Sequence, residues 1–387
     1  MELRVIRGQR ALEGMADALD DLHAATGTPV TARRPWLQTW LSCFHEEPLI
    51  VAAWSGERLE AVAPLAQHRR LGITETVAMG DGPSDRVAFP SRGEEASAAL
   101  SSGLAAYLLG QAGLWRLTVT HLPVDDPVAV ALVARLPQAK LVAGDTSPAL
   151  RFGPDRRLRS YVSRNHHQHI RQAINRMQRE GLTPEFEHLR EPAAIAGVLP
   201  QVEEVCRLRD AMLHRPSQLD DPRFGPFFRA VILDHAGRDE VELTILRLKG
   251  EVVAYCLCFV DNGSYRMWNC RFAPDWAHLS PGRVTNNEAM YHALADPGCS
   301  EFDWMLGDES YKSGVQNHME SSQNLLAWSS ASVRAVLDGP RSVRQALKEL
   351  KDRHEPLERL WEDSRRARER IRSRLRQAAW RSRKLPF

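Results

Sequence analysis

The feature that most constrains the fold is a run of three apolar segments joined by two short turns in the second half of the chain. Residues 241–248 and 252–260 flank Lys249-Gly250, and residues 265–272 follow the turn Asp261-Asn-Gly-Ser264. Short loops that contain glycine between two apolar runs are typical of paired antiparallel strands. The pattern therefore predicts a three-stranded antiparallel meander.

A helix and a further strand follow this meander. Residues 281–294 have the spacing of an amphipathic helix, and Phe302-Asp-Trp-Met-Leu306 is the next short strand. Ser280 stands at the N-cap position, where its side chain would accept a hydrogen bond from a free backbone amide. The amides left uncovered by Gly282, the helix dipole and Arg283 could then bind a phosphate, although an ordinary capped helix would begin with the same residues.

The first half of the chain also alternates strands and helices. Its clearest element is a hairpin of residues 49–54 and 59–65 around Ser55-Gly-Glu-Arg58. Further strands are predicted at 3–6 and 115–120, and helices near 9–25, 33–45, 95–110 and 127–135. Residues 80–85, rich in glycine and aspartate, predict a surface loop. Because Trp54-Ser-Gly-Glu57 resembles Leu248-Lys-Gly-Glu251, the two halves show a hint of duplication.

The division into domains follows from a change of composition. Residues 138–156 are rich in Gly, Asp, Ser and Pro, which predicts an irregular connection and a domain boundary. We therefore expect an N-terminal domain at residues 1–150, a C-terminal domain at 151–335 and a basic helical tail at 336–387. Within the C-terminal domain, helices are predicted at about 158–180, 193–213 and 222–236.

The tail differs from the rest of the chain in its charge. From Ser364 onward ten residues are basic and one is acidic, whereas the whole chain has a formal net charge of +2. A basic arm on an acidic body can bind a polyanion such as tRNA, or it can fold back onto its own body. The sequence leaves both alternatives open.

Composition and spacing exclude several classes of protein. No apolar run approaches the roughly 20 residues of a transmembrane helix, and no signal-peptide stretch begins the chain, so we expect a cytoplasmic protein without a membrane span. The six cysteines have neither the spacing of a zinc site nor the density of a disulfide scaffold. His166, His167 and His169 would point in different directions on a helix, so no metal site is expected.

Five segments of this chain, in this order, resemble the CelD-type acetyltransferases, a family named after cellulose biosynthesis. The segments are Trp36-Leu-Gln-Thr-Trp40, Ala63-Pro64-Leu65, Ser163–Arg171 with Arg176 and Gly181, Ser280-Pro-Gly282, and Phe302–Lys312. The resemblance covers about residues 30 to 335 and implies an α/β fold of tandem GNAT-like (acyl-CoA N-acyltransferase) domains, with mixed, mostly antiparallel sheets flanked by helices. It also implies a relationship to the Fem-type aminoacyl-tRNA-dependent transferases. One departure is that Leu279–Val284 keeps a single glycine of the usual GNAT pyrophosphate loop.

The resemblance and the position directly after the strand at 302–306 indicate candidate site residues. The catalytic candidates are Asp308 as base or orienting carboxylate, Tyr311 as acid, and Lys312 as a positive charge. The candidates for binding coenzyme A are Asn269, Cys270, Arg271, Ser280, Gly282, Arg283 and Val284. In the GNAT pattern a backbone amide of the strand that ends at Phe272 would stabilise the oxyanion. The candidates for contacting the acceptor are Arg164, Arg171 and Trp268.

The resulting prediction is an N-acyltransferase that moves an acyl group from acyl-CoA to an amine of a small-molecule or precursor acceptor. Its co-substrate would be acetyl-CoA or a longer acyl-CoA, and no metal is expected. One alternative is a Fem-like, aminoacyl-tRNA-dependent transferase that forms an amide, for which the basic tail is the supporting feature. The other is a non-catalytic GNAT scaffold that binds an anionic partner through the tail.

Overall fold

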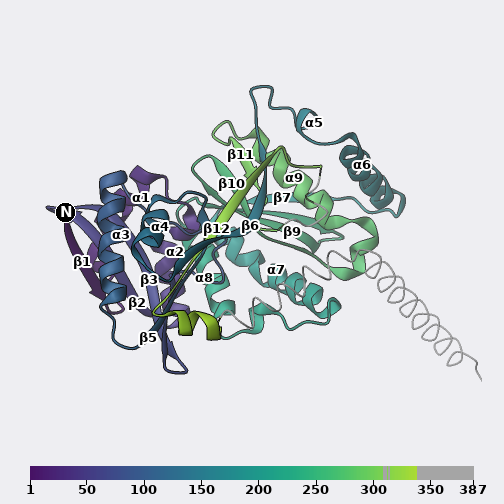
Figure 1. Cartoon of the computed structure of the whole chain (residues 1–387). Coiled ribbons are helices and arrows are strands. Elements are labelled where there is room, and N and C mark those ends of the chain that lie inside the picture. Colours follow the sequence, from purple (N-terminus) through teal and green to yellow (C-terminus); the bar gives the residue numbers. More distant parts are fainter. Residues whose placement is uncertain (308–311, 313, 338–387) are drawn as a thin grey trace, which may run out of the picture. The chain divides into compact units, whose positions relative to one another are not determined.

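The computed structural model describes residues 1–307, 312 and 314–337. The chain divides into two units, Met1–Ser329 and Ser330–Phe387, and all elements named below belong to the first unit (Figure 1). The predicted basic tail at 336–387 lies outside the described residues from residue 338 onward.

The first unit alternates strands and helices along its whole length. The strands are β1 (Glu2–Arg7), β2 (Glu47–Ser55), β3 (Arg58–Arg70), β4 (Ile73–Ala78), β5 (Leu114–Pro123), β6 (Ala139–Arg151), β7 (Glu185–Leu189), β8 (Val241–Leu248), β9 (Glu251–Asp261), β10 (Ser264–Phe272), β11 (Glu301–Asp303) and β12 (His318–Trp328). The α-helices are α1 (Ala16–Thr26), α2 (Arg34–Phe44), α3 (Glu94–Leu109), α4 (Pro127–Arg135), α5 (Leu158–Tyr161), α6 (Arg164–Arg179), α7 (Pro192–Met212), α8 (Phe224–Ala236) and α9 (Pro281–Ala295). Short 3₁₀ helices occupy Glu13–Met15, Val30–Ala32, Gln218–Asp220 and Pro274–Leu279.

All strands of the described residues join one sheet, in the order β1-β2-β3-β4-β5-β12-β6-β11-β10-β9-β8-β7. Two neighbouring pairs, β4 with β5 and β10 with β11, are parallel, and the other pairs are antiparallel. The order is symmetric from its two ends, because each half contributes four antiparallel strands and then a parallel fifth strand. The next neighbour of each fifth strand comes from the other half: β12 pairs with β5, and β6 pairs with β11. The predicted mixed, mostly antiparallel fold is therefore confirmed.

The predicted meander is present as β8, β9 and β10. Its two turns place Lys249 and Gly250 at φ of 53° and 79°, and Asn262 and Gly263 at 49° and 72°. Two successive residues with positive φ make a type I′ turn, whose twist matches that of the antiparallel strands it joins. Glycine at the second position adopts this conformation without a steric penalty. Local sequence thus specifies this part of the fold.

One core joins the two halves of the chain. Trp36 of α2 is fully buried, and its ring lies 5.3 Å from Phe227 of α8, 5.2 Å from Phe259 of β9 and 5.4 Å from Trp268 of β10. Edge-to-face contacts of this kind add to the free energy gained by burying the rings. The side chains of the first half are therefore packed directly against the strands that carry the candidate site.

Several elements differ from the sequence prediction. Residues 139–151 form β6 instead of an irregular connection, because their backbone groups pair with β11 and β12 far along the chain. β4, β7 and β12 are strands that the local pattern did not indicate. The helix predicted over about 158–180 is divided into α5 and α6, with Ser163 as the N-cap of α6. The predicted domain boundary lies within β6, and the two-domain division stays a prediction.

None of the helices among the described residues combines the length and apolar character needed to cross a bilayer.

Candidate functional site

The main cavity of the site lies where β10 and β11 separate. The two strands pair only over Ser264–Arg266 of β10, and beyond that point the next residues of each strand line a cavity of about 430 Å³. One wall consists of Met267, Trp268, Asn269, Cys270 and Arg271, and the other of Trp304, Met305, Leu306 and Lys312. A cleft between separating parallel strands can accept an extended ligand, because the two strand edges that face each other no longer pair with one another.

β10 carries a β-bulge within this cavity. Met267 pairs with Cys258 and Asn269 pairs with Leu257, so Trp268 has no opposite residue on β9. The extra residue of a bulge is left out of the ladder, and its amide can then serve a ligand. The neighbouring Asn269 side chain is held in place, since its Oδ1 accepts a hydrogen bond of 2.6 Å from Tyr255.

A loop from the first half of the chain, residues 80–85, forms another wall of the cavity. Three indole N–H groups hold it: Trp36 donates to Ser84 Oγ at 2.7 Å, Trp268 to the carbonyl of Pro83 at 3.1 Å, and Trp40 to the carbonyl of Asp81 at 3.3 Å. The loop is also compact. At Gly80, φ is 89° and a Cβ would lie 2.3 Å from Ser84 Oγ, so only glycine fits.

Asp85, at the end of this loop, borders both the main cavity and a second, smaller one. Burial raises the pKa of the Asp85 carboxyl to about 6, and the charge of Asp303 contributes to the rise. Lys312, Arg86 and the backbone amide of Leu306 act in the opposite direction. Asp85 is therefore a carboxylate whose pKa is poised one unit below neutral pH, as a general base requires.

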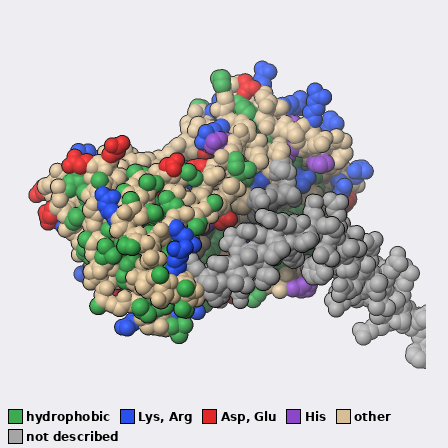
Figure 2. Space-filling view, viewed as in Figure 1, with side chains coloured by type: hydrophobic (Ala, Val, Ile, Leu, Met, Phe, Trp, Pro, Cys, Tyr) green, Lys and Arg blue, Asp and Glu red, His purple; other side chains and the backbone are tan. Residues whose placement is uncertain are grey.

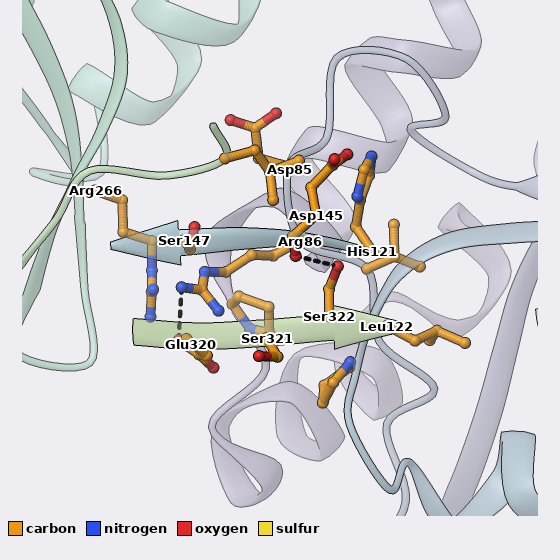
Figure 3. A pocket seen from close by; sticks show the side chains of 14 residues that line it. Asp85, Arg86, His121, Leu122, Asp145, Ser147, Arg266, Glu320, Ser321 and Ser322 are labelled. Atoms are coloured by element: carbon orange, nitrogen blue, oxygen red, sulfur yellow. Dashed lines mark hydrogen bonds and ion pairs between the residues drawn. The ribbon is translucent and has the colours of Figure 1, made fainter. Parts of the chain in front are cut away.

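The second cavity has a volume of about 140 Å³, and most of the residues that line it are polar or charged (Figure 3). Its polar lining side chains are Asp85, Arg86, His121, Asp145, Ser147, Arg266, Glu320, Ser321 and Ser322. Arg86 reaches across to Glu320, with Nη2 and Oε2 2.7 Å apart. The cavity contains carboxylates, hydroxyls and guanidinium groups together, which suits a small polar molecule with an amine and further hydrogen-bonding groups.

A buried ion cluster lies beside the smaller cavity, which two of its arginines line. Asp303, with no exposed surface, accepts hydrogen bonds from Arg86 at 2.7 and 3.0 Å and from Arg266 at 2.9 Å. Arg266 also contacts Asp261 at 2.5 Å. These pairs link the loop that carries Asp85 to β10 and β11, so the relative position of the two cavities depends on them.

The amino end of α9 lies beside the end of β10. Gly282 is packed so closely that a Cβ there would be 3.0 Å from Cδ1 of Phe272, the residue after Arg271. Arg283 is exposed and lies 3.2 Å from Nδ1 of His169, whereas Val284 is buried in the core.

The prediction that the Ser280 side chain caps α9 is wrong. Ser280 has a left-handed φ of 55°, and its side chain makes no capping hydrogen bond. The left-handed conformation turns the chain sharply between the 3₁₀ helix at Pro274–Leu279 and α9, and the exposed serine side chain does not satisfy the first amides of the helix.

Lys312 lies buried at the edge of the main cavity. Its ammonium group donates to the carbonyls of Leu306 at 2.9 Å, Gly307 at 3.2 Å and Met305 at 3.5 Å. A lysine in this position holds the turn that follows β11 and contributes positive charge to the cavity wall. The other two catalytic candidates, Asp308 and Tyr311, lie outside the described residues.

Arg164 and Arg171 belong to a different place on the surface. Both are exposed on α6 and line a shallow cavity of about 710 Å³ with His167 and with Tyr291 of α9. Figure 2 shows blue and purple side chains gathered in the region of α6. The structure thus brings Trp268, Asn269, Cys270, Arg271 and Lys312 together in one cavity and separates Arg164 and Arg171 from them.

Sequence reasoning missed Asp85. The run Gly80-Asp-Gly-Pro-Ser-Asp85 has the composition of an exposed turn, and nothing local indicates that distant tryptophans bury its end. Asp85 becomes a candidate site residue only in the folded protein, because the two halves of the chain meet at this loop.

Comparison with known proteins agrees with this geometry. Residues 164–313 match the model of a family described as an acetyltransferase (GNAT) domain. This part of the chain, from α6 to the turn after β11, is therefore similar to a GNAT acetyltransferase domain. The predicted enzyme class, an acyltransferase, is confirmed at this level, and the match does not distinguish a CelD-type subgroup.

Two solved structures share the fold of this chain over most of its length. FemX is 10% identical with a TM-score of 0.63, and the similarity covers 87% of this chain and 100% of that one. A C-terminal domain assigned to a lysylphosphatidylglycerol synthetase from Agrobacterium fabrum is 14% identical with a TM-score of 0.54, over 84% and 96% of the two chains. At these identities the similarity shows the fold alone. No curated protein shows significant sequence similarity to the chain.

Proposed function

We propose that this protein transfers an acyl group from an acyl-coenzyme A to an amine, with Asp85 as the general base. The observation that carries the proposal is the position of the Asp85 carboxylate at the junction of two cavities, one suited to a thioester and one to a polar amine.

The donor would lie between the separated ends of β10 and β11. Its acyl carbonyl would reach the bulge at Trp268, where the backbone amides of Trp268 to Cys270 are candidates to stabilise the oxyanion. Its phosphates would lie at the amino end of α9, where the helix dipole and Arg283 attract anions. The same phosphates would also contact Ser280, Gly282 and the backbone amide of Val284.

The acceptor amine would enter the smaller cavity beside Asp85. Asp85, Asp145 and Glu320 attract an ammonium group, and the limited volume of about 140 Å³ favours a compact acceptor group. An amine must lose a proton to act as a nucleophile, and the Asp85 carboxylate borders the cavity in which that proton would be released.

The proposed reaction transfers the acyl group from the sulfur of coenzyme A to the amine nitrogen in one step. The amine nitrogen attacks the thioester carbonyl carbon, a C–N bond forms, and the C–S bond breaks. Asp85 accepts the proton lost by the amine, and the coenzyme A thiolate takes up a proton as it leaves. We retain Tyr311 as the proposed acid, Asp308 as a further orienting carboxylate, and Lys312 as a positive charge near the thioester.

The test compares two carboxylates of the same loop. Asp85→Asn removes the proposed base, whereas Asp81→Asn changes an aspartate whose side chain accepts a hydrogen bond from Thr120 and lines neither cavity. The assay measures thiol release from acetyl-CoA across a panel of primary amines. We expect Asp85→Asn to lower kcat/KM about 100-fold or more and Asp81→Asn to change it little. Equal rates for Asp85→Asn and wild type would refute the role of Asp85.

A second candidate donor is an aminoacyl-tRNA. The observation that favours it is the exposed basic face of α6, with Arg164 and Arg171, together with the basic tail. Salt-dependent binding of tRNA, with no thermal stabilisation by acetyl-CoA, would support this donor over coenzyme A. A non-catalytic scaffold predicts no turnover with either donor.

The finer parts of the proposal rest on the sequence. They are a CelD-type subgroup, two GNAT-like domains at 1–150 and 151–335, a tail at 336–387 that contacts tRNA, and a cytoplasmic location. Deletion of residues 364–387 tests the tail directly, because tRNA binding through it would be lost while acetyl-CoA binding would remain.

A further inference from the structure

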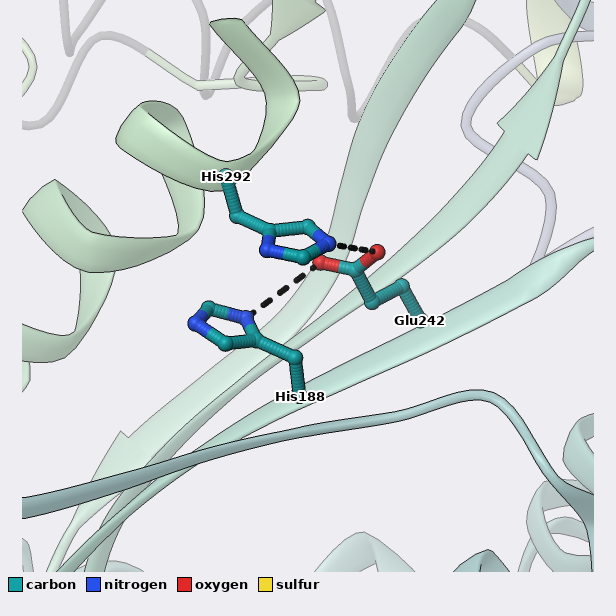
Figure 4. Close-up of side chains that lie close together, drawn as sticks. All are labelled: His188, Glu242 and His292. Carbon is teal, nitrogen blue, oxygen red and sulfur yellow. Dashed lines mark ion pairs between the residues drawn. The ribbon is translucent and has the colours of Figure 1, made fainter. Parts of the chain in front are cut away.

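Two histidines and a glutamate converge on the side of the sheet covered by α9. His188 of β7, Glu242 of β8 and His292 of α9 place one ligand atom each within 4.8 Å of one another (Figure 4). The two imidazole rings stack with their centroids 4.0 Å apart and an interplanar angle of 16°, and a nitrogen of each ring faces the Glu242 carboxylate.

The distances in this cluster match those between the ligands of a small divalent cation. Nε2 of His292 lies 3.2 Å from Oε2 of Glu242, and Nδ1 of His188 lies 3.6 Å from Oε1. Nitrogen and oxygen atoms bound to tetrahedral zinc at about 2.0–2.1 Å are roughly 3.4 Å apart. The three ligand atoms lie within 4.8 Å of one another, and Nδ1 of His188 also lies 3.1 Å from Thr244 Oγ1. Side-chain rotations that give up this contact with Thr244 would bring the three atoms around one ion.

Neighbouring groups support the three ligand atoms. The second ring nitrogen of His188 lies 3.5 Å from Oε1 of Glu288, the carboxylate–histidine arrangement that orients a metal-binding imidazole. Oε2 of Glu242 also interacts with Arg190 at 3.2 Å and with the hydroxyl of Tyr265 at 3.2 Å. These contacts fix the carboxylate and leave Oε1 for a cation.

The cluster is accessible from solvent on one side. The Glu242 side chain is 1% exposed, whereas those of His188 and His292 are 21% and 39% exposed. A hydrated ion can therefore reach the histidines, and the buried carboxylate would complete its coordination.

We infer that His188, Glu242 and His292 bind a divalent transition-metal ion, with zinc the best match to two imidazoles and one carboxylate, and with water in the fourth position. The ion would tie α9 to β7 and β8. Since α9 begins at the proposed phosphate site, metal binding would hold that helix in place without taking part in acyl transfer. The expectation from the sequence that the protein has no metal site would then be wrong.

The charged groups around the cluster affect its two imidazoles differently. Burial lowers the pKa of His188, but the hydrogen bonds and charges of Glu242 and Glu288 outweigh it and raise the pKa to about 9. The pKa of His292 is lowered, chiefly by burial. Arg190, Asp239 and Asp296 are the other charged groups around the cluster.

The test uses the full chain without a polyhistidine tag, after treatment with a chelator. Zinc chloride is titrated into the wild type, His292→Gln and His278→Gln, followed by calorimetry. His278→Gln is the control, because His278 is an exposed histidine paired with Glu180 outside the cluster. We expect one equivalent to bind wild type and control equally, with at least a tenfold loss for His292→Gln. Cobalt(II) should give the visible bands of a low-coordinate site in the wild type.

The results separate the alternatives. Equal affinity of His292→Gln and wild type, or no stoichiometric binding to the wild type, would overturn the inference and leave the cluster as an ion-pair network. Glu288→Gln provides a second variant at a partly exposed position, and loss of its supporting carboxylate should weaken binding about tenfold. None of these measurements depends on acyl-transfer activity.

Discussion

Asp303 offers the sharpest test of how the two cavities are held together. Asp303→Asn keeps the shape of the side chain but removes its charge, so an NH₂ group or a neutral oxygen faces Arg86 and Arg266. Both guanidinium groups are largely buried, and hydrogen bonds of 2.7 to 3.0 Å now end on the carboxylate. Removing one partner from a buried charge cluster commonly costs about 3–5 kcal/mol.

The expected loss in the free energy of unfolding is near the lower end of that range. Arg86 keeps Glu320 at 2.7 Å, and Arg266 keeps Asp261 at 2.5 Å, so neither cation is left without a carboxylate. We expect Asp303→Asn to lower the free energy of unfolding by about 3 kcal/mol. Glu320→Gln is the matched control, since Glu320 contacts the same arginine but is 38% exposed; it should lose less than about 1 kcal/mol.

The same substitution has a second, independent effect. The charge of Asp303 raises the pKa of Asp85, so its removal should lower that pKa and move the acidic limb of the kcat/KM profile to lower pH. Urea unfolding measures the first effect and the pH–rate profile the second. Two results together would refute this reasoning. They are an equal loss in the free energy of unfolding for Asp303→Asn and Glu320→Gln, and an acidic limb of the kcat/KM profile that stays at the wild-type pH.

Three further predictions follow from single contacts. The wild-type kcat/KM should fall below about pH 6, because the Asp85 carboxyl, with its pKa of about 6, must be ionised to accept a proton; a flat pH profile from 5 to 8 contradicts this. Gly282→Val should force the ring of Phe272 to move and weaken acetyl-CoA binding about tenfold by calorimetry, whereas unchanged affinity would remove the amino end of α9 from the site. Trp36→Ala should cost about 3–5 kcal/mol in urea unfolding, and a loss below 1 kcal/mol would show that the shared core is loosely packed.

Local sequence predicted those elements whose hydrogen bonds lie close along the chain. The meander of β8 to β10 and the hairpin of β2 and β3 were identified because their turn residues and apolar runs are adjacent. The helices α2, α3, α4, α7 and α8 followed from periodicity in the same way. The candidate residues from Trp268 to Arg271 line the main cavity, since they continue the third strand of the meander, and their roles stay a prediction.

Long-range pairing decided the rest. β6 and β12 have weak local patterns, and they are strands because each pairs with partners from the opposite half of the chain. Asp85 is a similar case: its loop has the composition of an exposed turn, and burial in the tertiary structure raises the pKa of its carboxyl. The sequence by itself therefore determined the local strands and helices, because turn geometry and periodicity depend on neighbouring residues. The acyltransferase class was indicated by the resemblance of its five segments to a known family. Only the tertiary structure brought Asp85 to the cavity and assembled His188, Glu242 and His292, because burial and electrostatic contact depend on residues far apart in the chain.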